Sequence, residues 1–589
     1  MSNVNITINN IDLSVEQGTT ILNAAKKIEI EIPSLCKMEM KDIGFIHHIS
    51  SCRVCLVEVL GRDELVPACS TPISEGMIIF TNTIKVMANR RLMIELLLSN
   101  HPKDCLYCPK NQRCDLQALA AKFGVREIRF ATDIIQYPLE YTKSIVRNPN
   151  KCIRCRRCEA ICRDIQTCNV LSQINRGEKA IVQTSFCDNL ENPENKACTF
   201  CGQCVAVCPV AALYETDFTW KLIEDISNKN KKVIVQVAPS VRAALGEEFG
   251  YEAGTNITGK MVSALKKMGF YRVFDTDFGA DMTVMEEAAE FKERLEKYLK
   301  GEKNVRLPLL TSCCPAWVNF IEYNYPEMLD IPSSAKSPME IFGSIAKNIW
   351  AKEQGLERED IICVAVMPCL AKKYESGRKE FYFRDNPDVD YVITTRELAR
   401  IMKEMNIDLT KMEDNEFDNT LGESTGAGTI FGRTGGVIEA TMRTAYEWIT
   451  SNTLENIDFY ELRGLEGIRV AQIEIGGEHI KVGIAHGLGS ARKLLEKIKN
   501  GEETFHAIEI MACKGGCVGG GGQPYHHGNF EIIKKRIACL QEIDTSKTLR
   551  KSHLNPYVQD IYNRYLSYPL SKEAKRLLHT EFYPKKNEI

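Results

Sequence analysis

Apolar and polar residues alternate along the first 80 residues in a way that predicts short strands. The segment VNITINNIDLSV (residues 4–15) alternates strictly over much of its length, and CRVCLVEVL (52–60) and GMIIFTNT (76–83) are also strand-like. TTILNAAKKI (19–28) has the spacing of a helix. Residues 84–101 (IKVMANRRLMIELLLSNH) predict an amphipathic helix that ends at a group of cysteines.

From Lys232 onward, strand-like and helical segments alternate. The apolar runs KVIVQVAP (232–239), YRVFDTDF (271–278), DIICVAVMP (360–368) and DYVITT (390–395) are interleaved with longer helical patterns such as TVMEEAAEFKERLEKYL (283–299). This alternation is typical of α/β units. Residues 141–215 show little periodicity, so we expect bound metal to hold that segment together. The last 50 or so residues are basic and aromatic, and we expect helices there with little chemistry.

Composition changes this picture through one residue type, cysteine. The 589 residues include 24 cysteines, 17 of them before residue 210, within a globular balance of 44% hydrophobic and 26% charged residues. A net charge of −3 excludes a dedicated nucleic-acid binder. The N-terminus lacks the features of a secretory signal, and the longest apolar run, residues 361–371, falls short of the roughly 18 residues of a membrane span. We therefore expect a cytoplasmic chain with no membrane partner, whose reduced thiols bind metal or carry electrons.

Two cysteine tetrads have the spacing of bacterial ferredoxins, with two, two and three residues between successive cysteines. In that pattern three thiolates of one tetrad and one of the other bind each [4Fe–4S] cube. We therefore assign one cluster to Cys152, Cys155, Cys158 and Cys208, and a second to Cys198, Cys201, Cys204 and Cys162. Two zinc knuckles are the alternative, although these usually separate their cysteine pairs by a longer gap. Arg163 follows Cys162 where proline is usual.

A third candidate site lies upstream of the tetrads. It consists of His101, Cys105, Cys108 and Cys114. Three thiols and one imidazole are compatible with zinc. Because the segment lies between two iron–sulfur segments, we favour a [4Fe–4S] cluster with one histidine ligand, which removes one negative charge and shifts the potential.

The first cysteine group, formed by Cys36, Cys52, Cys55 and Cys69, lies on the strand-rich segment. It suits a [2Fe–2S] centre held by the loops of a small ferredoxin-like fold. His47 and His48 fall within this segment, and we expect both to be exposed loop residues because four thiolates already complete the site. Four redox centres in a row would form an electron path, which a zinc scaffold does not need.

The cysteines after residue 210 follow a different pattern. Cys314, Cys369, Cys513 and Cys517 could hold one further cubane, and the glycines around the last two leave room for a bulky group. Cys313, beside a candidate ligand, is a plausible proton carrier. The four remaining thiols, for which we expect ordinary buried or incidental roles, are Cys168, Cys187, Cys363 and Cys539.

Several of these segments resemble the signatures of a known family. TSCCPAW (311–317), MPCLAKKYE (367–375), FGRTGGVIEATMRTA (431–445) and MACKGGCVGGGGQP (511–524) resemble the signature segments of the [FeFe]-hydrogenases. The N-terminal half resembles the accessory domains of multi-cluster bacterial members and the electron-input part of respiratory complex I. Residues 550–583 resemble the family's small-subunit extension. The resemblance covers almost the whole chain.

The resemblance implies a multidomain α/β protein. Its parts would be a β-grasp [2Fe–2S] ferredoxin-like domain (1–80), a His/Cys-ligated [4Fe–4S] domain (81–125), a 2[4Fe–4S] ferredoxin-like domain (140–220), a catalytic domain (231–530) and a small helical C-terminal extension (531–589). The expected cofactors are one [2Fe–2S] cluster, three accessory [4Fe–4S] clusters and an H-cluster, in which a [4Fe–4S] cube is joined to a diiron subsite carrying CO, cyanide and a dithiolate bridge.

The resemblance also implies roles around the H-cluster. Cys314, Cys369 and Cys513 would bind the cube, and Cys517 would bridge it to the diiron subsite. Lys372 would face one cyanide, where an ammonium group can donate hydrogen bonds, whereas Lys373 better fits an ordinary surface lysine. Met367 and Met511 would pack beside the subsite, with Pro239 and Ser240 near the other cyanide. Met339 stands where many relatives carry glutamine.

A proton route can be argued in part from helix geometry. Glu287, Glu290 and Arg294 share one face of a predicted helix, which without context would indicate a solvated face with an ion pair. The resemblance instead implies a relay from Cys313 through Glu287, Ser333 and Glu290 that leads outward near Arg294. Heterolytic cleavage of H2 in a dry site requires such proton-carrying groups.

The expected function is reversible H2 oxidation and proton reduction, with electrons exchanged with ferredoxin. The alternative is the catalytic subunit of a multimeric NAD(P)-reducing or electron-bifurcating hydrogenase with flavin-bearing partners. A non-catalytic electron-transfer scaffold or H2 sensor is a reading from a different class. A dinucleotide loop at residues 422–432 (GESTGAGTIFG) is a weak further alternative, because no buried strand is expected before it.

Overall fold

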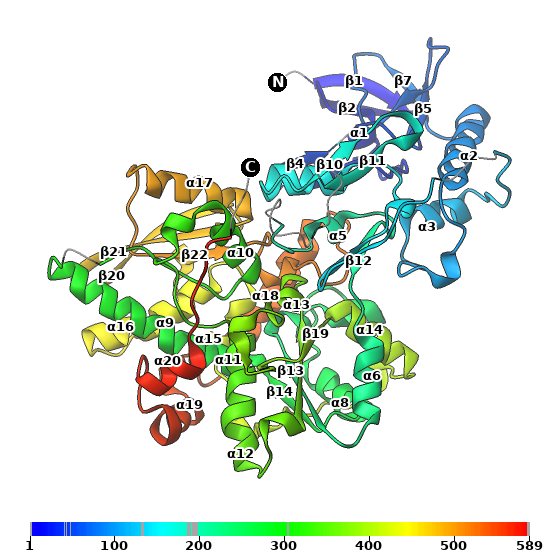
Figure 1. Ribbon diagram of the computed structural model, residues 1–589. Coiled ribbons are helices and arrows are strands. Elements are labelled where there is room, and N and C mark those ends of the chain that lie inside the picture. The colour runs from blue at the N-terminus through cyan, green and yellow to red at the C-terminus, as the bar shows by residue number, and fades with distance from the viewer. Residues whose placement is uncertain are drawn as a thin grey trace.

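The computed structural model describes residues 3–40, 42, 44–47, 49–130, 135–184, 190, 198–302 and 305–585. Figure 1 shows an N-terminal part, in blue and cyan, beside a larger body that runs from green to red. His48 and Cys187, both named in the sequence predictions, lie outside the described residues.

The N-terminal domain is built on a five-stranded sheet of order β2-β1-β7-β5-β6. Its strands are β1 (Asn3–Ile8), β2 (Ile11–Glu16), β5 (Leu56–Val59), β6 (Val66–Pro67) and β7 (Ile78–Phe80), and helix α1 spans Ile21–Lys26. The alternation predicted for β1 is confirmed, because Val4, Ile6 and Ile8 are buried between exposed or half-buried neighbours. The predicted [2Fe–2S] ferredoxin-like fold is therefore present, and it packs its own core.

Helix α2 (Ile84–Ser99) confirms the predicted helix but not its amphipathic character. Its buried residues include Arg90 and Glu95, whereas Ile84 is 90% exposed. Arg90 donates to the carbonyl of Leu56 over 3.2 Å, so a polar contact with the sheet replaces part of the expected apolar stripe.

The ferredoxin-like part contains more regular structure than its sequence predicted. Strands β8 (Glu140–Tyr141), β9 (Ile145–Arg147) and β12 (Leu213–Glu215) form one small sheet, and β10 (Leu171–Ile174) pairs with β11 (Ile181–Thr184). Helices α4 (Arg157–Ala160) and α5 (Gln203–Val207) follow the first cysteines of each tetrad. Elements of two to five residues are too short to produce a detectable hydrophobic period.

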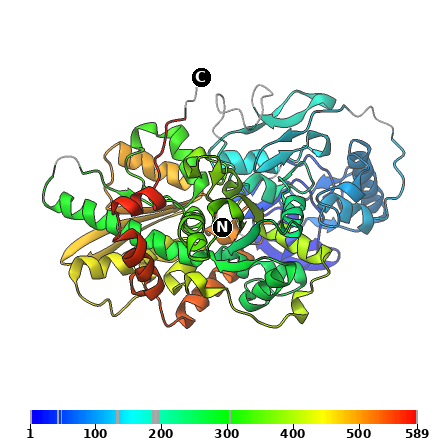
Figure 2. The same ribbon diagram turned by 60° about the horizontal axis from the view of Figure 1, so that its bottom comes forward.

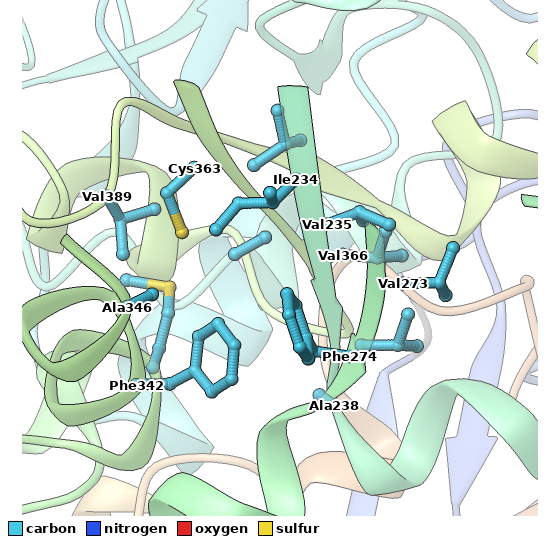
Figure 3. Close-up of a cluster of buried hydrophobic side chains, with 14 of the residues drawn as sticks. Ile234, Val235, Ala238, Val273, Phe274, Phe342, Ala346, Cys363, Val366 and Val389 are labelled. Atoms are coloured by element: carbon cyan, nitrogen blue, oxygen red, sulfur yellow. The ribbon is translucent and has the colours of Figure 1, made fainter. Parts of the chain in front are cut away.

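The body contains a parallel sheet of order β14-β13-β16-β19. The strands are β13 (Lys232–Val237), β14 (Arg272–Asp275), β16 (Ile361–Met367) and β19 (Tyr391–Thr394), as the apolar runs predicted. Helices α8 (Thr258–Met268), α11 (Pro338–Ile345) and α14 (Thr395–Glu404) cover it. Figure 3 shows Phe342 of α11 beside Phe274 and the strand residues of this sheet, with Cys363 among them. Cys363 is thus a core thiol, as expected.

A second sheet has the order β15-β22-β21-β20. It consists of β15 (Leu309–Leu310), β20 (Ile468–Ile475), β21 (Glu478–His486) and β22 (Ala507–Met511), and only the β20–β21 pair is antiparallel. The long helix α9 (Thr276–Leu299) packs against α11, α15 (Gly426–Thr429) and α16 (Gly436–Thr450). This position carries the acidic side chains of α9 into the interior.

The C-terminal extension is helical, as predicted. It comprises α18 (Phe530–Ser546), α19 (Pro556–Ile561) and α20 (Lys572–Leu578). Figure 2 shows the red helices lying across one side of the body. Cys539, on α18, is a buried thiol of the expected kind. In the part of the chain that the structure describes, no helix is both long and apolar enough to cross a bilayer.

The dinucleotide-loop alternative is wrong. A 3-10 turn at Asn419–Leu421, rather than a strand, precedes the glycine segment. A Cβ atom at Gly426 would lie 2.1 Å from a carboxylate oxygen of Asp544, and one at Gly428 would lie 2.5 Å from the carbonyl oxygen of Asp277. These glycines therefore permit close packing of α15 against α18 and α9.

Candidate active site and accessory cluster sites

An enclosed cavity of about 80 Å³ lies where strands of both sheets end. Pro239 and Ser240 follow β13, Met367 and Cys369 lie at the end of β16, and Met511 closes β22. The carboxyl ends of parallel strands are the usual place for a binding site in such sheets. The predicted residues that line this cavity are Pro239, Ser240, Cys313, Cys314, Met367, Cys369, Lys372, Met511, Cys513 and Cys517.

Four thiols of this cavity come from three distant segments. Burial raises the pKa of Cys369, and the neighbouring thiols of Cys314 and Cys517 raise it further. Burial likewise raises the pKa of Cys517 to about 12, with Cys314 adding to the shift. All four thiols, those of Cys314, Cys369, Cys513 and Cys517, line this one cavity. Thiols this hard to ionise in a dry cavity suit a bound cationic metal group, which would favour the thiolate form.

Glycines let the backbone close tightly around the same thiols. Gly516, at φ +97°, precedes Cys517, and a Cβ there would lie 2.6 Å from the amide nitrogen of Thr434. A Cβ at Gly520 would lie 2.3 Å from the carbonyl oxygen of Pro368. Side chains at these positions would push the cysteine loops apart, so the glycine run is needed for the shape of the cavity.

Lys372 points its ammonium group into this region and is 9% exposed. Its Nζ lies 2.6 Å from a carboxylate oxygen of Glu375 and donates to the carbonyl of Cys313 over 3.3 Å. Burial alone would lower the pKa of Lys372, but the charge of Glu375, its hydrogen bond to the ammonium and the nearby thiols together outweigh burial, and the pKa is raised. Lys372 therefore carries a fixed positive charge at the cavity wall.

The expectation that Lys373 is a surface lysine is wrong. Its side chain is buried, and its Nζ lies 2.9 Å from a carboxylate oxygen of Glu397 and 2.8 Å from the carbonyl oxygen of Val392. Two adjacent lysines thus serve two different buried ion pairs. The pattern KKYE contains no signal for this, because Glu397 lies on another element.

The cavity wall also carries an unpaired hydroxyl group. Ser240 is 0% exposed, and its Oγ has no hydrogen-bond partner among the described residues. A buried polar atom left without a partner costs free energy, roughly 1–3 kcal/mol, unless a ligand supplies one. Met339, the position that differs from many relatives, also lines the cavity, and its carbonyl accepts a hydrogen bond from Gln236 over 3.0 Å.

Cys313 lines the cavity, and Glu287 lies next to it in space because it accepts a hydrogen bond from the amide of the preceding residue, Ser312. Burial raises the pKa of Cys313 well above its usual value, and the nearby Glu287 raises it further. Burial, with Glu290 as the next contributor, raises the pKa of Glu287 to about 8. Glu287 also accepts hydrogen bonds from the amide of Ser312 and the hydroxyl of Thr441, each at a distance of 3.5 Å. A carboxyl group with this pKa can both hold and release a proton near neutral pH.

The next part of the predicted relay differs from expectation. Glu290 accepts hydrogen bonds from the amide of Ser334 at 3.2 Å and from its hydroxyl group. The hydroxyl of Ser333 instead accepts from the amide of Ala335 over 3.2 Å. Arg294 donates to the carbonyls of Ile331 (2.8 Å) and Pro332 (3.3 Å). Its guanidinium group therefore holds a loop rather than pairing with a carboxylate.

The structure brings together the four cysteines of the N-terminal domain. The thiol of Cys36 interacts with those of Cys52 and Cys69, and Cys55 interacts with Cys69. The expectation for His47 is wrong, because it lies buried in strand β4 (Phe45–His47) and its Nε2 donates to the carbonyl of Cys155 over 2.8 Å.

The next predicted site consists of His101, Cys105, Cys108 and Cys114. His101 is buried, and this burial, followed by the charge of Lys151, lowers its pKa to about 4, so that its ring is neutral and free to coordinate. Lys151 also interacts with Cys108, whose charge in turn affects Cys114. Cys105 is exposed.

The two tetrads line separate cavities, and each cavity takes cysteines from both tetrads. A cavity of about 20 Å³ is lined by Cys152, Cys155, Cys158 and Cys208. A cavity of about 30 Å³ is lined by Cys162, Cys198, Cys201 and Cys204. Cys168, expected to be an ordinary thiol, also lines the second cavity.

Hydrogen bonds join these sites into one arrangement. His47 donates to the carbonyl of Cys155, and Arg157 donates to the carbonyl of Lys37, next to Cys36, over 2.9 Å. On another side of the same site, Lys110 donates to the carbonyl of Cys208. The [2Fe–2S] and His101 segments thus both contact the site of the first tetrad. These contacts favour a branched electron path over the single row of redox centres expected from the sequence.

The described residues contain no group of three His, Cys, Asp or Glu side chains close enough to chelate a single metal ion. Zinc would need such a tight tetrahedral group. The thiols of the two tetrads instead line two small cavities, which fit a multi-iron cluster at those two sites.

Five family descriptions match consecutive parts of the chain. The C-terminal domain of the iron-only hydrogenase large subunit matches residues 231–521, and the iron hydrogenase small subunit matches residues 530–585. A 2Fe-2S iron–sulfur cluster binding domain matches residues 1–83. The NADH-ubiquinone oxidoreductase-G iron–sulfur binding region matches residues 90–129, and a 4Fe-4S binding domain matches residues 194–214.

Full-length relatives and solved structures agree with these matches. The chain is 53% identical over 584 residues to the NADP-reducing hydrogenase subunit HndD of Solidesulfovibrio fructosivorans, covering 99% of each protein. It is 37% identical over 583 residues to iron hydrogenase 1 of Clostridium pasteurianum, covering 98% of this chain and 99% of that protein. The structure of the [FeFe]-hydrogenase HydA1 from Chlamydomonas reinhardtii aligns with a TM-score of 0.57 at 36% identity, covering 63% of this chain and 100% of that one.

Proposed function

This chain belongs to the iron-only, or [FeFe], hydrogenase family, and we propose that it converts H2 within an assembly that exchanges electrons with NADP(H). It is an oxidoreductase with several iron–sulfur domains ahead of its hydrogenase domain. The observation that carries the proposal is the convergence of Cys313, Cys314, Cys369, Cys513 and Cys517 on one enclosed cavity.

The residues around this cavity fit an H-cluster. We assign Cys314, Cys369 and Cys513 to the cube and Cys517 to the bridge between the cube and the diiron subsite. The glycine-lined thiol loops, the unpaired hydroxyl of Ser240 and the buried ammonium of Lys372 support this assignment. When bound, the H-cluster supplies the iron at which H2 is split heterolytically.

Other cavity residues exclude water and fix orientation. With an H-cluster bound, Lys372 would offer charged donors to a cyanide ligand, and Pro239 and Ser240 would form part of the wall around the diiron subsite. Met367 and Met511 supply apolar, polarisable surface beside the subsite. The dry wall strengthens each of these interactions because the local dielectric is low.

Protons leave through side chains of this chain. The thiol of Cys313 takes up a proton released in the cavity when H2 is split, and Glu287 accepts that proton next. The raised pKa of Glu287 suits it to accept and release protons near neutral pH. Glu290 lies one helical turn further along α9. The family relay through Ser333 toward Arg294 stays part of the proposal, although the hydrogen bonds that Glu290 accepts come from Ser334.

Electrons travel through the accessory sites. We propose one [2Fe–2S] cluster on Cys36, Cys52, Cys55 and Cys69, and three [4Fe–4S] clusters on the His101 site and the two mixed tetrad sites. The amide of Gln203 donates to the sulfur of Cys513 over 3.3 Å, which supports transfer from the second tetrad site to the H-cluster. The fork at the first tetrad site provides two points of electron entry.

The electron partner is the finer part of the proposal. Similarity to an NADP-reducing hydrogenase subunit over 99% of the chain favours a flavin-bearing, NADP(H)-linked partner over ferredoxin alone. Exposed apolar side chains at Leu106, Tyr107 and Trp220 lie in a groove beside Cys108 and are suited to a protein contact. A cytoplasmic location also stays a prediction.

Two experiments test the proposal. The anaerobically matured chain should evolve H2 from reduced viologen, and a preparation with an intact diiron site but no H2 evolution would overturn the catalytic claim. Purification under native conditions from its own cells should recover flavin-containing subunits. A monomer that is fully active with ferredoxin would instead favour the simpler electron partner.

A further inference from the structure

A chain of hydrogen bonds continues from Glu290 into the C-terminal extension. The hydroxyl of Ser334 lies within hydrogen-bond distance of a carboxylate oxygen of Glu290 and 2.7 Å from Nδ1 of His579. His579 Nδ1 itself lies 3.8 Å from Glu290. Ser334 therefore bridges an acid of helix α9 and an imidazole of the extension.

The second nitrogen of this imidazole also has a partner. Nε2 of His579 lies 2.8 Å from a carboxylate oxygen of Glu286, which also accepts hydrogen bonds from the hydroxyl of Tyr562 and from the amide of Leu570 at 2.8 Å. Glu286 is fully buried. The titratable groups that face His579 among the described residues are Glu286 and Glu290, with Tyr562 bound to the far side of Glu286.

Backbone contacts hold His579 in this place. The amide of Lys336 donates to the carbonyl of Leu578 over 2.7 Å, and the amide of Thr580 donates to the carbonyl of Ser334 over 2.8 Å. His579 lies between these two bonds, directly after α20, and its side chain is 7% exposed. The imidazole is thus fixed next to Ser334 and close to the surface.

Helix α9 has no comparable group at this end of the relay. The guanidinium of Arg294 donates to the carbonyls of Ile331 and Pro332, and arginine does not release protons at ordinary pH. Imidazole, by contrast, exchanges protons near neutral pH and has two nitrogens that can bind and release them on different sides.

We propose that His579 carries protons between Glu290 and the protein surface, so that the C-terminal extension contributes a relay residue to the hydrogenase reaction. The proposal rests on the hydrogenase function argued above. In the outward step, protonated Glu290 donates to Ser334 Oγ while the Ser334 hydroxyl proton moves to Nδ1 of His579. The step leaves a Glu290 carboxylate, a neutral serine and an imidazolium whose Nε2–H faces Glu286. The imidazolium then gives one proton to water, and no electron moves.

The test uses the full-length matured enzyme and the variant His579→Gln, which keeps polar atoms but cannot carry a proton. Turnover should fall on the order of tenfold to a hundredfold, with an altered pH profile, and added imidazole should restore part of it. His553→Gln is the matched control, because His553 lies in the same extension but bonds to Glu447 (2.7 Å) and Thr444 (3.1 Å). It should retain wild-type turnover.

Ser334→Ala provides a second route if His579→Gln does not fold, since it breaks the bridge without altering the extension. It should lower turnover in the same way, with unchanged infrared bands from the metal site. Wild-type turnover in both variants, or no rescue by imidazole, would overturn the proposal.

A measurement independent of turnover uses ¹⁵N-labelled histidine in protein lacking the diiron subsite. The ring signal that disappears in His579→Gln should change its titration in Glu290→Gln. An unchanged titration would overturn the link to Glu290. An inactive wild-type enzyme would count against the hydrogenase function, while this titration would still test the link.

Discussion

The side-chain amide of Gln203 donates a hydrogen bond to the sulfur of Cys513 over 3.3 Å, and a second to the carbonyl of Gly519 over 3.1 Å. Gln203 lies between two cysteines of the second tetrad, 310 residues before Cys513 in the chain. The ferredoxin-like domain therefore contacts a proposed H-cluster ligand directly.

Replacing Gln203 by leucine should lower the reduction potential of the H-cluster cube. Hydrogen bonds to cluster sulfurs favour the reduced, more negative state, so their loss shifts the potential downward. Removing one such bond should also cost about 1 kcal/mol of stability. An anaerobic redox titration followed by EPR measures the shift. Gln166→Leu is a suitable control, because the side chain of Gln166 forms hydrogen bonds with backbone atoms only. The reduction potential of the cube in this variant should match that of the wild type.

Replacing Glu375 by glutamine tests whether Glu375 keeps the ammonium group of Lys372 charged. The ammonium would stay buried without its counter-charge, which should lower its pKa and cost about 3 kcal/mol. Thermal unfolding measures the cost. H2 evolution in this variant should decline more steeply with rising pH than in the wild type, because Lys372 loses its charge at a lower pH. Identical pH profiles would contradict this role.

Glu287 should be largely protonated at pH 7, because its pKa is raised to about 8 from a usual value of 4.5. The stability that this group contributes is present below about pH 4.5 and is lost as pH rises toward 8. Glu287→Gln, which is always neutral, should escape this loss and unfold at a higher temperature than the wild type above pH 8. Its turnover should fall roughly 10²-fold or more. An infrared carboxyl band at pH 7 that is absent from the variant would identify the protonated group.

Glu340 is a buried residue whose sequence pattern suggests a helix cap that the structure does not contain. Ser337-Pro-Met-Glu340 has the form of a helix capping box, but Ser337 donates to Glu375 over 3.0 Å, and neither carboxylate oxygen of Glu340 has a partner among the described residues. Burial, and then Glu375 and Asp388, raise its pKa well above the usual value. Glu340→Gln should therefore leave stability at pH 7 unchanged or improved.

Glu397 is the matched comparison for Glu340. The box Thr394-x-x-Glu397 is fully formed, and Glu397 also pairs with the buried Lys373 at 2.9 Å. Glu397→Gln should lower stability by about 3 kcal/mol in the same unfolding assay. If both substitutions changed the stability by the same amount, the formed capping box at Thr394 and the unformed one at Ser337 would not differ in their contribution to folding.

Motif spacing predicted much of the site but not the contacts between distant segments. The apolar runs predicted all four strands of the parallel sheet, and the cysteine pattern together with the resemblance predicted ten residues that line the central cavity. Both depend on local sequence. His47, by contrast, looked like a loop residue because its partner is a backbone carbonyl 108 residues away.

The relay region shows the same limit. Ser334 and Ser333 are adjacent and chemically identical in sequence, and only the path of the loop decides which of them contacts Glu290. The extension seemed poor in chemistry because the partners of His579 lie more than 240 residues earlier. Side-chain pairing across such separations leaves no periodic or motif signal in one sequence.

The central claim is that the cysteine-lined cavity converts H2. The most direct measurement is an infrared spectrum of the anaerobically matured protein, recorded before and after H2 is admitted. A working H-cluster in this cavity should give bands from iron-bound CO and cyanide that shift reversibly with H2 and are lost when Cys517 is replaced by alanine. Absence of these bands after maturation, or bands that do not respond to H2, would contradict it.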